Sequence, residues 1–178
     1  AWYKTSPYHA TADLPEKKST ALDIGTAVHG WALEGVLPIK GTVRRAGKDW
    51  EAAEEKAKEQ NTVALNVADY EKVEHCVAAL HKNPHIKMLL EHKKRVCEAS
   101  VFAKHEGLCL KARPDLYIQS QGIIADIKTT QSANPYDFER ITLDRFGYTI
   151  QAAFYVKTLT LAKLPVKRFL FINVEKEP

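Results

Sequence analysis

The sequence has few cysteines, no long apolar run and no strong excess of charge of one sign. Its three cysteines, Cys76, Cys97 and Cys109, form no closely spaced pair, so neither a disulfide framework nor a four-cysteine zinc or iron–sulfur site is expected. No apolar stretch approaches the roughly 18 residues of a membrane span, and the first residues do not resemble a signal peptide. We therefore expect a cytoplasmic protein that does not associate with a membrane.

What the sequence does have is the composition of a globular domain. Hydrophobic residues make up 45% and charged residues 27% of the 178 residues, which argues against a disordered or fibrous chain. The net charge of +4 permits an anionic partner but does not require one. We expect one domain over residues 1–178, with an irregular lead-in at 1–20 and trimmed termini.

Apolar periodicity and turn residues predict two halves of different structure. Helices are expected over 21–35, 48–60, 67–80 and 84–91. Three strands of a meander are then expected over 96–102, 108–118 and 123–130. A short helix over 134–141, a longer one over 148–162 and a fourth strand over 166–174 complete the pattern. The longer helix is expected to turn Ile150, Phe154, Val156 and Leu159 toward the core. The order of helices followed by β-β-β-α-β indicates an α/β fold.

The third predicted strand contains two charged residues that an apolar strand does not readily accommodate. Asp126 and Lys128 are two residues apart, so both side chains emerge on one face while Ile127 points to the other. Burying either charge unpaired is costly. Two explanations are open: a mutual ion pair on a solvent-facing strand, or a metal-bound aspartate beside a lysine that holds or polarises a water molecule.

A second carboxylate is expected at the same end of this hairpin. Pro114-Asp115 falls near the middle of the preceding strand, where a proline removes a ladder hydrogen bond and re-aims the next side chain. Two neighbouring carboxylates repel each other unless a divalent cation neutralises them. Carboxylate oxygens suit Mg²⁺ or Mn²⁺, so Asp115 and Asp126 together with Lys128 predict a metal site.

These residues resemble the signature of the PD-(D/E)xK nucleases. Pro114-Asp115, ten intervening residues and Asp126-Ile127-Lys128 match that motif on its usual hairpin, and the α-β-β-β-α-β order matches the family core. Further matches are Glu98 on the first strand, the string Gly25-Thr26-Ala27-Val28-His29, the pair Gln151 and Tyr155 as QxxxY, and Thr129-Thr130 after Lys128. Together they resemble the RecB-like branch, and within it the phage-type RecE (exonuclease VIII) nucleases. Taken singly, Glu98, His29, Gln151 and Tyr155 are also consistent with ordinary surface or core residues.

The resemblance implies a mixed sheet flanked by helices and a two-metal mechanism with Mg²⁺ or Mn²⁺. The implied metal ligands are His29, Glu98, Asp115, Asp126 and the carbonyl of Ile127. Lys128 would orient the attacking water and help to deprotonate it. Gln151 and Tyr155 would position the scissile strand or the ligands.

The resemblance also implies a substrate and partners. RecE-like and lambda-type exonucleases are ring-shaped homo-oligomers that encircle duplex DNA, degrade the 5′-ended strand and leave a 3′ single strand for an annealing protein. This chain would then be bacterial or phage-encoded. Candidate DNA contacts are Lys93, Lys94 and Arg95, in the densest basic run. Arg113 is a further candidate, for which phosphate contact and structural pairing are both open.

Two other functions remain open at this stage. The same core chemistry serves structure-specific and restriction-type endonucleases, which differ in loops and assembly. A catalytically silent nucleic-acid-binding or phage assembly protein could also keep the fold. The complete set of candidate ligands argues against this last alternative.

Overall fold

The computed structural model describes residues 19–177, so the expected irregular lead-in lies almost entirely outside the described residues. The helical elements are α2 (Thr20–His29), η2 (Gly30–Glu34), α3 (Lys48–Glu59), α4 (Val67–Lys82), α5 (Pro84–Leu90), α6 (Pro135–Asp137), η3 (Phe138–Leu143), α7 (Asp144–Phe146) and α8 (Tyr148–Leu161). The strands are β1 (Ile39–Lys40), β2 (Ala64–Leu65), β3 (Val96–Cys97), β4 (Val101–His105), β5 (Leu108–Ala112), β6 (Leu116–Ile118), β7 (Ile123–Thr130) and β8 (Arg168–Glu175). Among the described residues, the helices are too short or too polar to span a membrane.

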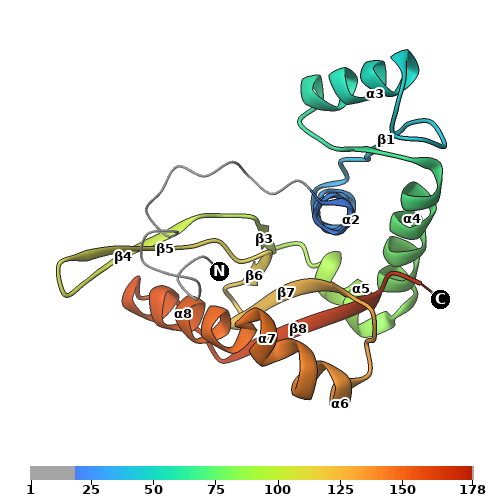
Figure 1. The fold of residues 1–178 in the computed structure, drawn as a ribbon. Coiled ribbons are helices and arrows are strands. Elements are labelled where there is room, and N and C mark those ends of the chain that lie inside the picture. The colour runs from blue at the N-terminus through green and yellow to red at the C-terminus, as the bar shows by residue number, and fades with distance from the viewer. Residues whose placement is uncertain (1–18, 178) are drawn as a thin grey trace.

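The centre of the fold is a mixed four-stranded sheet in the order β3-β6-β7-β8 (Figure 1). β6 is antiparallel to both β3 and β7, whereas β8 is parallel to β7. A parallel pair requires a long crossover, which the segment from α6 to α8 supplies. The expected α/β fold with a mixed sheet is confirmed.

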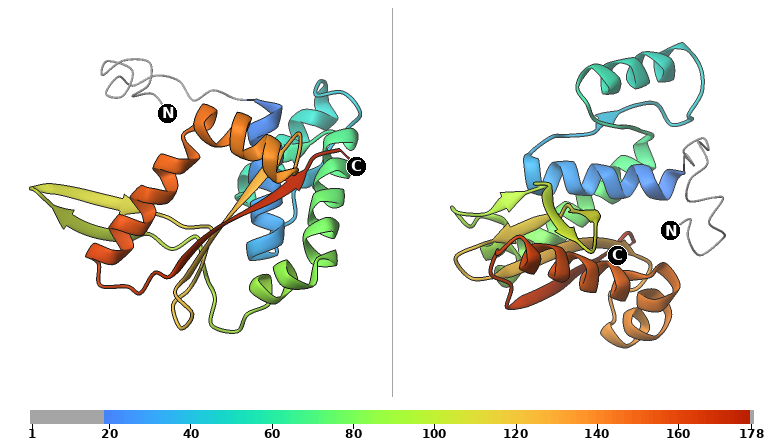
Figure 2. Two further views of the ribbon diagram at one scale, coloured as in Figure 1. Left: turned by 90° about the horizontal axis from the view of Figure 1, so that it is seen from below. Right: turned by 90° about the vertical axis from the view of Figure 1, so that its left-hand side faces the viewer.

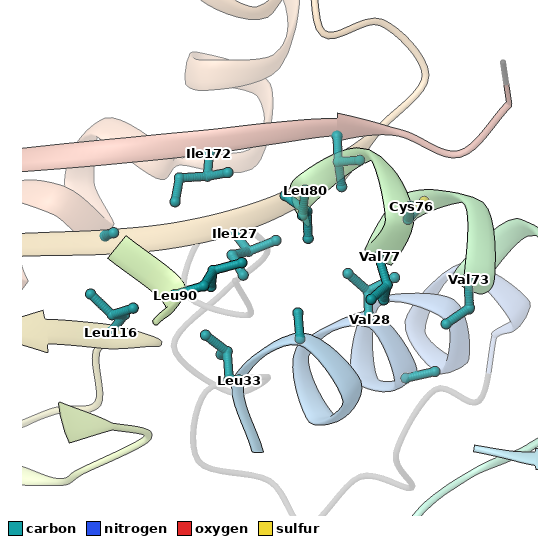
Figure 3. Close-up of a cluster of buried hydrophobic side chains, with 14 of the residues drawn as sticks. Val28, Leu33, Val73, Cys76, Val77, Leu80, Leu90, Leu116, Ile127 and Ile172 are labelled. Atoms are coloured by element: carbon teal, nitrogen blue, oxygen red, sulfur yellow. The ribbon is translucent and has the colours of Figure 1, made fainter. Parts of the chain in front are cut away.

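Helices from the two halves of the chain cover opposite faces of this sheet (Figures 1 and 2). α2, α4 and α5 pack on one face, and α8 packs on the other with β4 and β5. The larger core, on the first face, includes Val28, Leu33, Val73, Val77, Leu80, Leu90, Leu116, Ile127 and Ile172 (Figure 3). Each such side chain stabilises the fold by about 1.5–3 kcal/mol when fully buried. This core fixes α2 against β7.

Capping residues, glycine and proline mark the helix ends. Ser19 caps α2 by accepting a hydrogen bond from the Leu22 N–H, and Gly35 ends η2 at a φ of 72°, a conformation that glycine adopts at little cost. Pro84 occupies the first turn of α5, which Asn83 caps. The helix predicted over 21–35 is therefore confirmed, with its last turn widened to a π-helix.

The structure divides two of the three predicted meander strands, those over 96–102 and 108–118. Glu98, at a φ of 53°, separates β3 from β4, and Arg113-Pro114-Asp115 separates β5 from β6. A side chain at positive φ and a proline both interrupt a ladder. As a result β4 and β5 form a separate hairpin that projects from the sheet (Figures 1 and 2). The two breaks adjoin, because the Glu98 N–H donates to the Asp115 carbonyl at 3.2 Å.

Two helix predictions also need correction. The helix expected over 134–141 continues through a π-helical segment and α7 to Phe146. Ile150 and Phe154 were predicted to face the core, but both are exposed, while α8 buries Thr158 and Leu159. Apolar residues lie all around α8, so their spacing does not identify the buried face.

Candidate functional site

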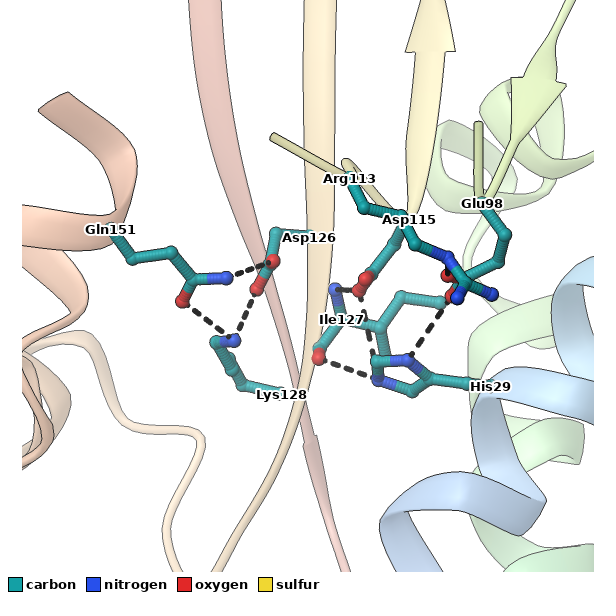
Figure 4. A network of polar contacts seen from close by, with 8 residues as sticks. All are labelled: His29, Glu98, Arg113, Asp115, Asp126, Ile127, Lys128 and Gln151. Carbon is teal, nitrogen blue, oxygen red and sulfur yellow. Dashed lines mark hydrogen bonds and ion pairs between the residues drawn. The ribbon is translucent and has the colours of Figure 1, made fainter. Parts of the chain in front are cut away.

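The candidate site lies where the ladder between β6 and β7 ends. The last pair of this ladder is Leu116 with Ala125, and the same register would place Pro114 opposite Ile127. Pro114 has no N–H to donate to the Ile127 carbonyl, and side chains contact both backbone groups of Ile127. The Ile127 N–H donates to Asp115 Oδ2 at 2.7 Å, and its carbonyl lies 2.9 Å from His29 Nε2 (Figure 4).

His29, Glu98 and Asp115 form one cluster, although they come from distant parts of the chain. His29 is the last residue of α2, while Glu98 and Asp115 occupy the two strand breaks. His29 Nδ1 lies 3.8 Å from Glu98 Oε1, and His29 Nε2 lies 3.6 Å from Asp115 Oδ2. One ligand atom from each of the three lies within 4.8 Å of the others. The cluster therefore offers an imidazole nitrogen and carboxylate oxygens to a single cation.

Asp126 and Lys128 lie on the other face of β7, directed toward α8. Lys128 Nζ is 2.6 Å from Asp126 Oδ2. Gln151 joins the pair, because its Nε2 donates to Asp126 Oδ1 at 2.9 Å and its Oε1 accepts from Lys128 Nζ at 3.0 Å (Figure 4). Asp126 is only 1% exposed. Of the two explanations left open for these charges, the mutual ion pair is present, but the strand does not face solvent at Asp126.

Burial and charge shift the pKa values of the cluster. Burial raises the pKa of Asp115 to about 6; the nearby His29 opposes this rise and the Asp126 carboxylate adds to it. Burial alone would lower the pKa of His29, but its close contact with Glu98 and the charges of Asp115 and Asp126 outweigh burial and raise it. The close contact with His29, helped by the charge of Arg113, lowers the pKa of Glu98. Protons and a cation would thus compete for the same oxygens and nitrogen.

The comparison with protein families gives the context for this geometry. A family described as "PDDEXK-like domain of unknown function (DUF3799)" matches residues 3–178. The chain belongs to this family. No curated protein matched the chain. Membership of the PDDEXK-like family indicates a nuclease-type hydrolase, and nucleases of this class generally use divalent metal ions.

The residues of this PDDEXK-like domain fit such a cation. The donor set is an imidazole and carboxylates, with the carbonyl of Ile127 beside it, and hard divalent cations favour oxygen ligands. Asp115 and Asp126 are both buried and repel each other. A divalent cation bound between them would relieve that repulsion, because its positive charge attracts both carboxylates.

The structure brings some of the predicted residues to the site and leaves others away from it. Arg113 Nε lies 2.7 Å from Glu98 Oε2, so of its two alternatives the structural pairing is observed. Tyr155 lies one turn beyond Gln151, half-buried, and its ring packs 6.4 Å from that of Phe169.

The predicted basic run lies away from the cluster of His29, Glu98 and Asp115. Lys93 and Lys94 line a cavity with Ser120 at the turn between β6 and β7, at the other end of β6 from Asp115. The Arg95 guanidinium donates to the Leu33 carbonyl at 3.1 Å, so this arginine helps to hold the end of η2.

Sequence reasoning missed one residue beside the site. Lys128 Nζ lies 4.4 Å from the centre of the Tyr148 ring, a contact that stabilises the ammonium group through the electron-rich ring face. Tyr148 begins α8, three residues before Gln151. Residues three apart on a helix are neighbours, so this spacing was the available signal.

Proposed function

We propose that this protein is a metal-dependent double-stranded DNA exonuclease of the phage recombination type. It degrades the 5′-ended strand and leaves 3′ single strands for annealing. One observation carries the proposal: the end of α2, the end of β3 and the break between β5 and β6 bring His29, Glu98 and Asp115 to one side of β7, opposite the Asp126–Lys128 pair. The RecE-type assignment is supported by the three motifs that resemble that branch, which contain His29, Lys128 and Gln151. His29 contacts Ile127 of β7, and Gln151 contacts both Asp126 and Lys128 of β7.

The proposed ligands of two Mg²⁺ or Mn²⁺ ions are His29, Glu98, Asp115, Asp126 and the carbonyl of Ile127. When bound, such ions stabilise the charge that develops on the phosphate and make water a stronger nucleophile.

The proposed work of the remaining residues follows from their contacts. Lys128 donates a hydrogen bond to the attacking water, and its charge stabilises the hydroxide that forms. Gln151 hydrogen-bonds to both Lys128 and Asp126, so it fixes the position of the Lys128 ammonium group relative to the Asp126 carboxylate. Tyr155 supports Gln151 from the next turn of α8 and fixes the face that the helix presents to the scissile strand.

The test compares DNA topologies under one set of conditions. Equal amounts of linear, nicked and covalently closed duplex are incubated with the protein and Mg²⁺, with and without excess chelator. We expect linear duplex to be consumed from its ends, closed circles to survive and the chelator to abolish cleavage. Linearisation of closed circles would favour the endonuclease alternative. Degradation in excess chelator would exclude the metal mechanism altogether.

A further inference from the structure

A stack of aromatic rings leads from Lys128 toward the protein surface. Tyr148 lies under Lys128 Nζ, and Phe146 stacks on Tyr148 with ring centres 5.7 Å apart and planes 25° apart. Phe146 is 56% exposed. The stack therefore connects the lysine of the proposed site with an aromatic ring that solvent reaches.

Two exposed rings of this region each have an arginine beside them. The Arg145 guanidinium lies 5.7 Å from the centre of the Phe146 ring. Tyr136 is 61% exposed, and Arg140 lies 5.0 Å from its ring centre and hydrogen-bonds to its hydroxyl. Both pairs belong to the segment between β7 and α8, which follows the Asp126–Lys128 strand directly.

Packing of the core accounts for the inner rings but not for the outer two. Phe138 is buried and packs on Tyr148 and Phe171, as a core residue does. Phe146 and Tyr136 expose most of their surface, so core packing does not explain these two aromatic residues of the segment that follows β7. Exposed aromatic rings with adjacent arginines are the combination that binds single-stranded nucleic acid, because bases stack on the rings and guanidinium groups contact phosphates.

We propose that Phe146 and Tyr136 form a base-stacking platform for single-stranded DNA beside the cleavage site, with Arg145 and Arg140 contacting its phosphates. The inference deepens the proposed function, on which it rests. An exonuclease that removes one strand of a duplex must separate that strand from its partner near the reacting phosphate. The platform holds the separated bases next to Lys128 and so keeps the strand end in place between cuts.

The experiment measures binding and stacking without cleavage. A single strand containing 2-aminopurine is titrated with the protein in excess chelator, and both fluorescence anisotropy and quenching of the base are recorded. Phe146→Leu keeps an apolar side chain but removes the ring, and Phe146→Trp restores a ring. Phe102→Leu is the matched control, because Phe102 is 59% exposed and has Lys111 over its ring, but lies on the β4–β5 hairpin.

We expect Phe146→Leu to bind the strand about 5-fold or more weakly and to lose most of the quenching. Phe146→Trp should retain both signals, and Phe102→Leu should behave like the unmodified protein. Unchanged quenching in Phe146→Leu would overturn the platform, and so would an equal loss in Phe102→Leu. Equal melting temperatures of the variants establish that the exposed position does not affect folding.

A parallel digestion of linear duplex with Mg²⁺ separates this inference from the proposed function. If the unmodified protein digests duplex while Phe146→Leu binds normally, the platform is wrong and the exonuclease proposal stands. If the unmodified protein digests no DNA but quenches 2-aminopurine through Phe146, the platform stands and the exonuclease proposal is wrong. Binding of a protein partner instead would show as no quenching in any variant, which also overturns the platform.

Discussion

At the residue scale, each carboxylate of the site lies beside a different basic side chain of the protein. Lys128 lies against Asp126, Arg113 against Glu98, and His29 beside Asp115. These pairs offset the cost of holding three carboxylates close together in a partly buried place. A divalent cation that enters must compete with these side chains, so the same residues that stabilise the free protein also tune its affinity for metal.

The two residues on the α8 side of β7 should be essential for cleavage. We expect Asp126→Asn and Lys128→Ala each to lower duplex degradation by at least about 100-fold, because groups that stabilise transition-state charge are typically worth that much. Initial rates on linear duplex with saturating Mg²⁺ provide the measurement. Glu59→Gln, an exposed acid on α3, is the charge-matched control. Normal cutting by either variant would show that the site is misplaced.

Removal of His29 should have a smaller effect than removal of Asp126. His29→Ala deletes one neutral ligand and leaves the carboxylate charges that attract the cations. We expect a drop in rate that is smaller than for Asp126→Asn and that higher Mg²⁺ concentrations partly reverse. Rates measured over a range of Mg²⁺ concentrations test this. A His29→Ala protein that fails to fold would instead indicate that this residue only supports the core.

Metal binding should weaken in acid. The pKa of Asp115 is about 6 in the folded protein, against an ordinary value of 3.8, and the pKa of His29 is also raised. The proton on Asp115 therefore stabilises the metal-free fold, and this contribution is lost as the pH rises through 6. A cation binds the deprotonated ligands, so we expect its dissociation constant to rise at least about tenfold for each pH unit below 6, with protonation of His29 adding to that of Asp115.

Calorimetric titration with Mn²⁺ from pH 8 to pH 5 checks this dependence. Asp115→Asn is the control, because it has no proton to lose. It should bind Mn²⁺ weakly, with only the smaller change below pH 6 that protonation of His29 causes. Equal Mn²⁺ affinity at pH 8 and pH 5 in the unmodified protein would rule out Asp115 as the titrating ligand.

At the scale of elements, the site depends on where strands stop. Glu98 and Asp115 reach His29 because β3 and β5 each end there. Pro114 has no N–H to donate to the Ile127 carbonyl, so this carbonyl is free to contact the His29 imidazole. A continuous meander would have filled the same space with backbone hydrogen bonds. The interruption of the ladder thus creates the space in which side chains meet.

This also shows what the sequence could predict and what it could not. The third strand, with Asp126 and Lys128 on one face and Ile127 in the core, follows from period-two alternation alone. The break at Pro114 was signalled, but nothing local to Glu98 marks its positive φ. The buried face of α8 was missed, because Ile150 and Phe154 satisfy the same spacing as the buried residues. Such choices are made by packing between distant elements, which one sequence does not show.

Restoring the ladder should weaken the site without harming the fold. Pro114→Ala supplies an N–H opposite Ile127 that competes with His29 for the Ile127 carbonyl. We expect an unchanged or higher melting temperature together with a several-fold loss of Mn²⁺ affinity. Pro165→Ala, in the exposed loop before β8, is the matched control and should change neither. A Pro114→Ala protein that melts earlier and binds Mn²⁺ normally would contradict this explanation of the break.

At the scale of the whole molecule, the net positive charge is small and the predicted basic run lies away from the site. The net charge is +4, and the predicted basic residues do not gather at the site: Lys93 and Lys94 lie at the β6–β7 turn, and Arg95 is bonded to the Leu33 carbonyl. Of the predicted DNA-contacting residues of this basic run, a single copy therefore brings none to the His29–Glu98–Asp115 cluster. On this ground we propose the ring-shaped homo-oligomer that the resemblance implies, in which several copies contribute a few phosphate contacts each.

The ring proposal predicts that the salt dependence of DNA binding follows the state of assembly. Each phosphate contact releases counterions, so contacts summed over several subunits make the logarithm of affinity fall more steeply with the logarithm of salt. The binding slope is measured on blunt linear duplex in excess chelator, at protein concentrations above and below assembly, with mass in solution determined in parallel. We expect the steep slope to accompany the oligomer alone.

Lys93→Gln with Lys94→Gln should reduce the slope of the oligomer by more than the roughly two contacts that one subunit would lose. A monomer that binds and digests duplex with full activity would remove the ring, and with it the reason for closed circles to survive.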